Sequence, residues 1–399
     1  MNDGLFFAGW MLDGSGAPAR KDLLLRVQNG VIESLEHAGK EELGAGGVDY
    51  EDFSECTVLP GLVDCHVHLT LSGSDDEEIR REQIGYSFEQ NEPLMRKRIR
   101  KYLTCGILAL RDGGDAAAHT LRYKIWADSA RRYPVYLKAA GKGWRAEGRY
   151  GKLIGAPPED GLSLAESIDR QFGADHVKIL NSGLNSLVEF GMETPPQFRP
   201  EELEAAVRTA RRKGLETMVH ANGKLPVELA VRAGCRSIEH GFFMGEANMK
   251  MMADRQIFWV PTAFAMKALE SRLPPGQAEI ALKNLEHQLA QISRARELGV
   301  PVAVGTDAGG FGIRHGEAYR EELKLFVLAG FSPEEVIRCA TWEGARLLGL
   351  EQELGCLRKG MSACFVVVPG SPGCIPESLC RIRAVYFRGL PVTIPPWSP

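Results

Sequence analysis

The chain has 399 residues, of which 44% are hydrophobic and 25% are charged, and its formal net charge at pH 7 is −4. This composition is that of an ordinary globular protein, and the length is sufficient for one large domain with an accessory module. The small acidic excess argues against a nucleic-acid partner, and the chain has no run of about 18 apolar residues that would span a bilayer.

The N-terminal segment and the cysteines favour a cytoplasmic protein. The segment MNDGLFF has no cationic region followed by a long apolar core, so no signal peptide is predicted. The 9 cysteines form no CxxC pair, and their odd number leaves at least one thiol unpaired in any complete disulfide scheme. We therefore expect reduced, mostly buried thiols.

The first predicted element is a β-hairpin over residues 22–35. Its sequence, DLLLRVQNGVIESL, contains an Asn-Gly pair, which favours a tight turn between antiparallel strands. Strand-like segments return near the other end of the chain, as SACFVVVPG at 362–370 and RAVYFRGLPV at 383–392.

The next segment, TVLPGLVDCHVH at 57–68, is an apolar run that ends in two histidines. Residues i and i+2 of a strand point to the same face, so His66 and His68 would aim two imidazoles at one point, as a divalent metal requires. Cys65 should face the opposite side, where we expect it to pack in the core. A satisfied surface pair of histidines is the alternative for this motif alone.

Four later segments have the same form, a short apolar run that contains or ends in a possible ligand. They are HVKIL at 176–180 with Lys178, ETMVH at 216–220 with His220, RSIEHG at 236–241 with His240, and VAVGTD at 302–307 with Asp307. Helical patterns at 200–214 and 280–299 and a strand at 257–262 fit alternating βαβ units. In a parallel (β/α)8 barrel all strand C-termini open on one face, so these ligands would converge there.

The motifs resemble those of the metal-dependent amidohydrolase superfamily. The similarity is carried by PGLVDCHVH at 60–68, SIEHG at 237–241 and GTDAG at 305–309, and it continues to ATWEGARLLGL at 340–350. The chain is most similar to the imidazolonepropionase-like and Xaa-Pro dipeptidase-like branch. The resemblance implies a (β/α)8 TIM barrel over 58–350 and a small β-sandwich domain built from 1–57 and 351–399. Strands that merely cap the barrel are the alternative for the two chain ends.

The resemblance also implies two divalent metal ions. Lysine is rarely fully buried, and desolvation lowers the pKa of its amine, which can then take up carbon dioxide to give N6-carboxylysine. A salt bridge across the barrel mouth is the alternative for Lys178. Nitrogen and oxygen ligands suit zinc, while manganese, cobalt and iron stay open. The implied ligands are His66, His68 and Asp307 on the more buried ion, His220 and His240 on the more exposed ion, and carboxylated Lys178 between them.

The implied chemistry is hydrolysis by a hydroxide that bridges the ions, since coordination lowers the pKa of water from about 15.7 to about 7. Asp307 would accept the proton and pass it to the departing nitrogen. For the substrate we predict that Arg145 or Arg149, in the glycine-rich loop 141–161, binds a carboxylate. An ordinary solvated loop is the alternative. Further candidate substrate contacts are Tyr150, Asn181, Asn222 and His315.

Two other polar segments lie near the predicted site. The acidic segment SGSDDEEIRREQ at 72–83 follows the HxH strand and is a candidate for the pocket rim. Arg111 and Asp112 close the second predicted strand, where we expect an ion pair that supports the barrel mouth.

Three functions compete at this point. The leading prediction is a metal-dependent amidohydrolase that cleaves an amide bond in a small carboxylate-bearing compound, such as a dipeptide or an N-acyl amino acid. A cyclic amidase, deaminase or lactonase of the same superfamily is the alternative within enzymes. A non-catalytic barrel scaffold is disfavoured because every implied ligand residue is present. We expect a small molecule as the partner, and the oligomeric state stays open.

Overall fold

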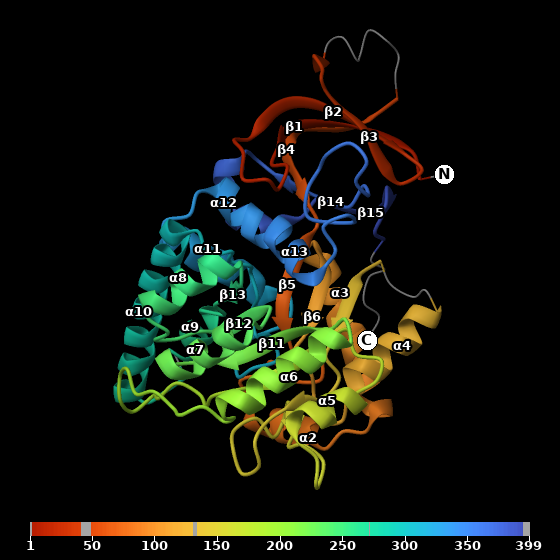
Figure 1. The fold of residues 1–399 in the computed structure, drawn as a ribbon. Coiled ribbons are helices and arrows are strands. Elements are labelled where there is room, and N and C mark those ends of the chain that lie inside the picture. Colours follow the sequence, from red (N-terminus) through yellow and green to blue (C-terminus); the bar gives the residue numbers. More distant parts are fainter. Residues whose placement is uncertain (1, 41–48, 131–133, 271, 394–399) are drawn as a thin grey trace.

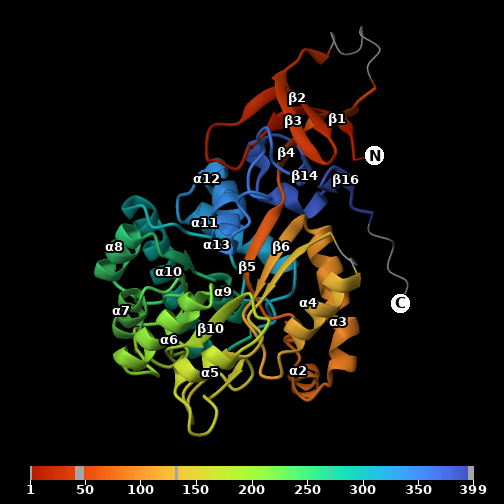
Figure 2. The same ribbon diagram turned by 45° about the vertical axis from the view of Figure 1, so that its right-hand side comes forward.

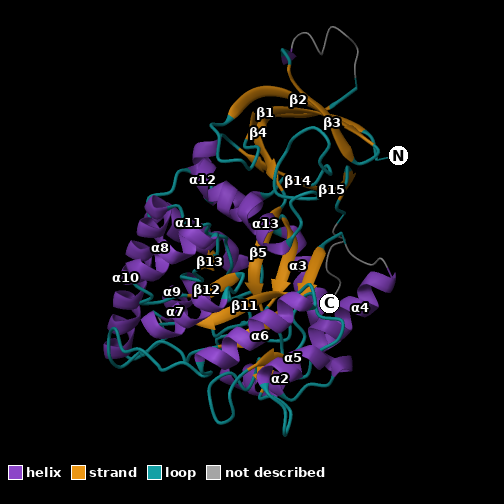
Figure 3. Ribbon diagram, viewed as in Figure 1, coloured by secondary structure: helices purple, strands orange, loops and turns teal. Residues whose placement is uncertain are grey.

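The computed structural model describes residues 2–40, 49–130, 134–270 and 272–393 (Figure 1). The chain is an α/β protein in which a sheet built from both chain ends lies above a body of parallel strands and helices (Figures 1 and 3). This sheet has seven strands in the order β16-β15-β14-β4-β1-β2-β3. Its strands are β1 (Gly4–Met11), β2 (Arg20–Gln28), β3 (Val31–His37), β4 (Glu51–Pro60), β14 (Phe365–Pro369), β15 (Ala384–Phe387) and β16 (Leu390–Pro391).

The predicted hairpin is confirmed as the antiparallel pair β2–β3. Gln28 pairs with Val31 across the turn. Asn29 and Gly30 have φ values of 52° and 76°, the left-handed conformation that a tight hairpin turn of this type requires and that Asn-Gly adopts easily.

The terminal segments form one mixed seven-stranded sheet. Within the described ranges these segments form no second sheet that faces it, so the predicted β-sandwich stays a prediction. The apolar face of this sheet includes Phe6, Val58 and Phe365. It is covered by Leu357 and Met361 from the segment that precedes β14. A loop can take the place of a second sheet here because only a small apolar face has to be buried.

The parallel strands form two separate hydrogen-bonded sheets. Within the described residues, no continuous strand pairing joins these sheets into one closed eight-stranded barrel. One sheet has the order β5-β6-β7 and the other β13-β12-β11-β10-β8-β9. The segment 302–308 lies between them, through bridges from Val302 to Trp259 and from Ala308 to Val67. The strands are β5 (Leu62–Val67), β6 (Ile107–Asp112), β7 (Tyr136–Ala139), β8 (Gly143–Trp144), β9 (Gly155–Ala156), β10 (His176–Leu180), β11 (Glu216–Ala221), β12 (Ser237–His240) and β13 (Phe258–Val260).

Helices surround the parallel strands on their outer side (Figure 2). The predicted helices at 200–214 and 280–299 correspond to α6 and α10, and α10 begins five residues before its prediction. No helix of the described chain is both long and apolar enough to cross a membrane. The helices are α2 (Glu77–Ile84), α3 (Phe88–Thr104), α4 (His119–Ala130), α5 (Leu164–Arg170), α6 (Pro200–Arg212), α7 (Lys224–Ala233), α8 (Glu246–Arg255), α9 (Phe264–Leu269), α10 (Pro275–Leu298), α11 (Glu317–Leu328), α12 (Pro333–Arg338) and α13 (Gly344–Leu348).

Candidate metal centre

Three of the predicted ligands form a compact group at the ends of neighbouring strands. His66 lies near the end of β5, and His68 directly follows this strand. Asp307 ends the segment that is hydrogen-bonded alongside β5. One ligand atom of each lies within 4.8 Å of the others. The Asp307 Oδ1 atom is 3.5 Å from Nε2 of both histidines. The geometry therefore suits a shared cation.

The other three predicted ligands lie beside this group. Lys178 is only 1% exposed, and its Nζ atom is 3.4 Å from His66 Nε2. The ring centroid of His240 is 4.5 Å from that of His220 and 5.0 Å from that of His66. In the parallel register Leu180 of β10 faces His220 of β11, and Ala221 faces His240 of β12. The predicted ligands, distant in sequence, therefore gather at one edge of the sheets.

Polar contacts set the direction of several imidazoles. Nδ1 of His68 lies 2.9 Å from the Gly114 carbonyl oxygen, and Nδ1 of His240 lies 2.7 Å from Thr262 Oγ1. Such contacts fix ring orientation and leave Nε2 for a metal. His220 differs, because its Nε2 atom lies 3.0 Å from the Gly183 carbonyl oxygen.

Burial sets the charge states of the group. It lowers the pKa of His68 and of His220 to about 3, and it holds the pKa of His66 and His240 well below the usual range. Neutral imidazole is the form that coordinates metals. Burial also lowers the pKa of the Lys178 amine, which favours its uncharged form.

A buried ion pair that sequence reasoning did not find supports His66. Glu239 is fully buried, and its Oε2 atom lies 2.9 Å from His66 Nδ1. Its Oε1 atom accepts a hydrogen bond of 2.8 Å from Arg111 Nη2 and another from the Ser237 hydroxyl. Arg111 was expected in an ion pair, and its partner is Glu239 rather than the adjacent Asp112, whose carboxylate accepts from backbone N–H groups.

The buried Asp64 holds the segment that contains Asp307. Its carboxylate accepts from the Thr306 backbone N–H at 3.0 Å and from the Thr306 hydroxyl at 2.7 Å. Asp307 and His240 both have left-handed φ values, 59° and 65°, which non-glycine residues seldom adopt. Such conformations persist only where surrounding contacts impose them. The position of Asp307 is therefore determined by its neighbours.

A cavity of about 720 Å³ opens onto this group. Of the predicted substrate contacts, Arg149, Tyr150 and Asn222 line it. The predicted role of Arg145 is not supported, because its side chain is buried outside the lining and donates to the Ala146 and Gly155 carbonyls at 3.0 and 3.3 Å.

Asn181 and His315 are also outside the lining of this cavity. Nδ2 of Asn181 donates to the Pro226 carbonyl at 3.0 Å. The ring nitrogens of His315 contact the Tyr102 hydroxyl and the Leu71 carbonyl at 3.0 and 2.8 Å. Both side chains are therefore bonded to other parts of the protein, and neither lines this cavity.

Arg80 lines the cavity and was not singled out from the sequence, although it lies in the segment 72–83 that was a candidate for the pocket rim. Its Nη1 atom donates to the Gly309 carbonyl at 3.2 Å. Its guanidinium carbon lies 5.5 Å from the centre of the Phe311 ring. Because the sequence around Arg80 is mainly acidic, the segment was not recognised as a source of a cation for the site.

The profile of the amidohydrolase family matches residues 57–389. The chain belongs to the amidohydrolase family. It is accordingly a hydrolase that acts on carbon–nitrogen bonds, and the His66, His68 and Asp307 group is its candidate metal site.

Individual relatives agree with this assignment. The chain is 25% identical to imidazolonepropionase of Paraburkholderia phymatum over 84% of each chain. It is 23% identical to ochratoxinase of Aspergillus niger, over 92% of this chain and 81% of the relative. A crystal structure of an Xaa-Pro dipeptidase with bound methionine in the active site superposes with a TM-score of 0.82 at 26% identity, over 98% of this chain and 99% of the other. The resemblance to the imidazolonepropionase and Xaa-Pro dipeptidase branch is confirmed.

Proposed function

We propose that this amidohydrolase is a binuclear metal enzyme that cleaves the amide bond of a small carboxylate-bearing substrate, such as a dipeptide or an N-acyl amino acid. The observation that supports it most is Lys178, an amine buried among histidines with Nζ 3.4 Å from His66 Nε2. A neutral amine there would add to carbon dioxide, forming a C–N bond and releasing a proton. The product, N6-carboxylysine, would place a carboxylate among the histidines.

The donor set fits two divalent ions, and we propose zinc. When bound, the ions supply Lewis acidity at the amide carbonyl and an activated water molecule. Asp307 is a quarter exposed, at 24%, so its carboxylate reaches the cavity as well as the histidines. It would accept a proton from water and deliver it to the departing nitrogen. The proposed ligands are His66, His68 and Asp307 for one ion, His220 and His240 for the other, and carboxylated Lys178 for both.

The lining of the cavity supports a substrate with an apolar part and a carboxylate. Arg80 and Arg149 bring two guanidinium groups to the lining, and such groups bind carboxylates in bidentate fashion. Leu71, Leu184 and Met266 are among the apolar side chains beside them. The similarity to an Xaa-Pro dipeptidase supports a dipeptide in particular.

A cyclic amide is the second candidate substrate. The similarity to imidazolonepropionase, over 84% of this chain, favours it. The same residues would serve either reaction, since both break a carbon–nitrogen bond at a carbonyl.

The fold that accompanies this proposal is a (β/α)8 barrel over residues 58–350, supported by a module from residues 1–57 and 351–399. Closure of the barrel is supported by the segment 302–308, which bridges to Trp259 of β13 and to Val67 of β5. A closed barrel would direct all the strand ends that bear ligands to one face.

The proposal is tested by incubating zinc-loaded protein with pools of dipeptides, N-acyl amino acids and cyclic amides and following products by mass spectrometry. We expect hydrolysis of at least one carboxylate-bearing amide. The Asp307→Asn variant should retain the fold and lose activity by at least about a hundredfold, the lower end of the usual effect of a general acid–base group. If only cyclic amides are hydrolysed, the second candidate substrate is the correct one. Equal activity of Asp307→Asn would refute the assigned role of that residue.

A further inference from the structure

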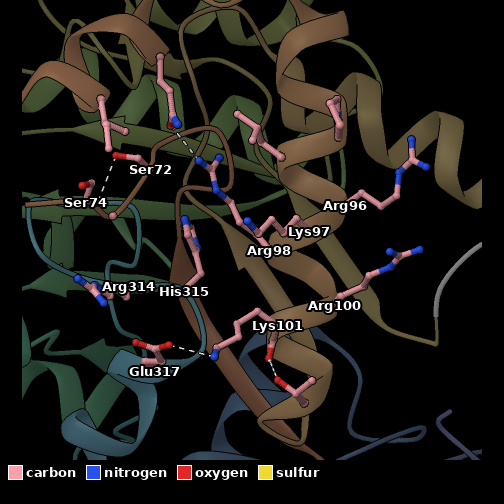
Figure 4. A pocket seen from close by; sticks show the side chains of 16 residues that line it. Ser72, Ser74, Arg96, Lys97, Arg98, Arg100, Lys101, Arg314, His315 and Glu317 are labelled. Atoms are coloured by element: carbon pink, nitrogen blue, oxygen red, sulfur yellow. Dashed lines mark hydrogen bonds and ion pairs between the residues drawn. The ribbon is translucent and has the colours of Figure 1, made fainter. Parts of the chain in front are cut away.

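A second cavity, of about 1090 Å³, lies beside α3 and outside the metal centre. Figure 4 shows Lys97, Arg98 and Lys101 of α3 on one side and Arg314 and His315 on the other. Within the described lining, Glu317 is the acidic residue, and Lys101 already lies 2.9 Å from it. The lining therefore contains more basic than acidic side chains, and one of the basic ones, Arg96, is paired with Glu92 outside the lining at 2.6 Å.

Arg98 is the most informative residue of this cavity, because it is a buried cation with neutral partners. Its Nη1 atom donates to the Leu69 carbonyl at 2.5 Å and its Nη2 atom to Gln83 Oε1 at 2.9 Å. Within the described ranges no carboxylate lies at ion-pair distance from it. Arg111, which is more deeply buried at 4% exposure, is by contrast paired with Glu239. A buried charge without a counter-charge is costly, so an anion in the cavity would stabilise Arg98.

The wall of the cavity opposite α3 carries Arg314, whose charge is only weakly neutralised. Nη2 of Arg314 is 3.9 Å from Asp75 Oδ1, while Arg272 holds the same carboxylate at 2.9 Å. His315 contributes no charge, since burial lowers its pKa to about 3 and both ring nitrogens have partners.

The cavity also has an apolar part. Ile79, Pro93 and Leu94 belong to the lining, and Ile79 is 42% exposed. The volume of about 1090 Å³ lies slightly above the range of about 300–1,000 Å³ that is usual for small-molecule sites. A ligand with an apolar body and several anionic groups would match both features.

We propose that this cavity is a binding site for a small organic polyanion, a molecule with an apolar body and at least two phosphate, sulfonate or carboxylate groups. The site is separate from the metal-centre cavity, whose lining shares no residue with it. It is nevertheless adjacent to the metal centre, because Arg98 is bonded to the carbonyl of Leu69, the residue that follows His68.

The test uses naphthalene-1,3,6-trisulfonate, whose sulfonates are weak metal ligands, titrated into the purified metal-loaded protein at low ionic strength. We expect saturable binding of one molecule per chain by calorimetry. The double variant Lys97→Gln/Arg314→Gln should weaken binding by about tenfold, because it removes two charge-assisted contacts. The matched control Arg232→Gln/Lys283→Gln removes the same charge from α7 and α10 and should change binding by less than about twofold.

Arg98→Gln should abolish binding, with its fold checked by circular dichroism. If Arg98→Gln does not fold, the binding measured for Lys97→Gln/Arg314→Gln still tests the proposal. The proposal is overturned by an absence of saturable binding, by equal weakening in both double variants, or by unchanged binding in Lys97→Gln/Arg314→Gln. One further result would overturn it. If the trisulfonate does not bind, and sedimentation shows a dimer of the native protein that Lys97→Gln/Arg314→Gln converts to monomers, the cavity is an interface between two copies of the chain.

Discussion

Replacement of Arg111 by methionine should strongly destabilise the protein. The side chain is 4% exposed, and it donates to the Cys65 carbonyl at 2.7 Å, to Ser237 Oγ at 3.0 Å and to Glu239 at 2.8 Å. Without it, the fully buried Glu239 carboxylate loses its counter-charge next to His66. Removing one partner of a buried ion pair costs about 3–5 kcal/mol, a large part of the usual net stability of about 5–15 kcal/mol.

The measurement is the free energy of unfolding in urea, made on chelator-treated protein so that bound ions do not contribute. The control is Arg26→Met, whose ion pair with Glu33 spans 3.8 Å between half-exposed side chains and should be worth less than about 1 kcal/mol. Arg111→Met/Glu239→Gln should recover part of the loss, because both charges are then absent. A loss in Arg111→Met no larger than that in Arg26→Met would show that the buried Glu239 does not need Arg111 as its counter-charge.

Three further outcomes follow from the site. Arg80→Gln and Arg149→Ala should each raise KM for carboxylate-bearing substrates by about tenfold, as expected for lost charge-assisted hydrogen bonds, and unchanged KM for every good substrate would exclude that role. His315→Gln tests the stability of the protein in acid. Burial lowers the pKa of His315 to about 3 in the folded state, while the value in the unfolded state is about 6.5. The contribution of neutral His315 to the free energy of unfolding is therefore fully present above pH ~6.5, and it is lost at about 1.4 kcal/mol per pH unit as the pH falls towards 3. Urea unfolding at pH 5 and 7 should therefore show a shallower loss in the variant, and equal losses would contradict the assignment. Removal of metal by chelation should lower the free energy of unfolding by about 4 kcal/mol for each bound ion, relative to protein with free zinc at 1,000 times the Kd of that ion, and equal stability would indicate that no ion binds the folded state.

The gathering of the proposed ligands could be predicted because it depends on regular geometry. His66 and His68 are two residues apart in a strand, so they share a face. Lys178, His220 and Asp307 lie in or after strands that run parallel, and the same ends of parallel strands meet at one edge. The Asn-Gly hairpin was predictable for a similar reason, since its turn conformation is a local property of two residues.

The surrounding contacts could not be predicted because they depend on irregular backbone. Arg145 and Arg149 are four residues apart in one loop, yet one is bonded into the wall and the other lines the cavity. Glu239 and Arg111 lie in strands of two different sheets. The sequence around either residue therefore does not indicate that the two form an ion pair. The cover of the terminal sheet was likewise not predictable, because strand patterns do not reveal whether a loop or a second sheet lies on the apolar face.

The most direct test of a binuclear centre is the metal content of protein purified without chelator from cells grown with zinc, measured by plasma mass spectrometry. We expect about two divalent ions per chain in the native protein and fewer in Lys178→Ala. One ion per chain in both proteins would remove Lys178 from the centre. No bound metal, even after reconstitution with zinc and bicarbonate, would contradict the proposed enzyme altogether.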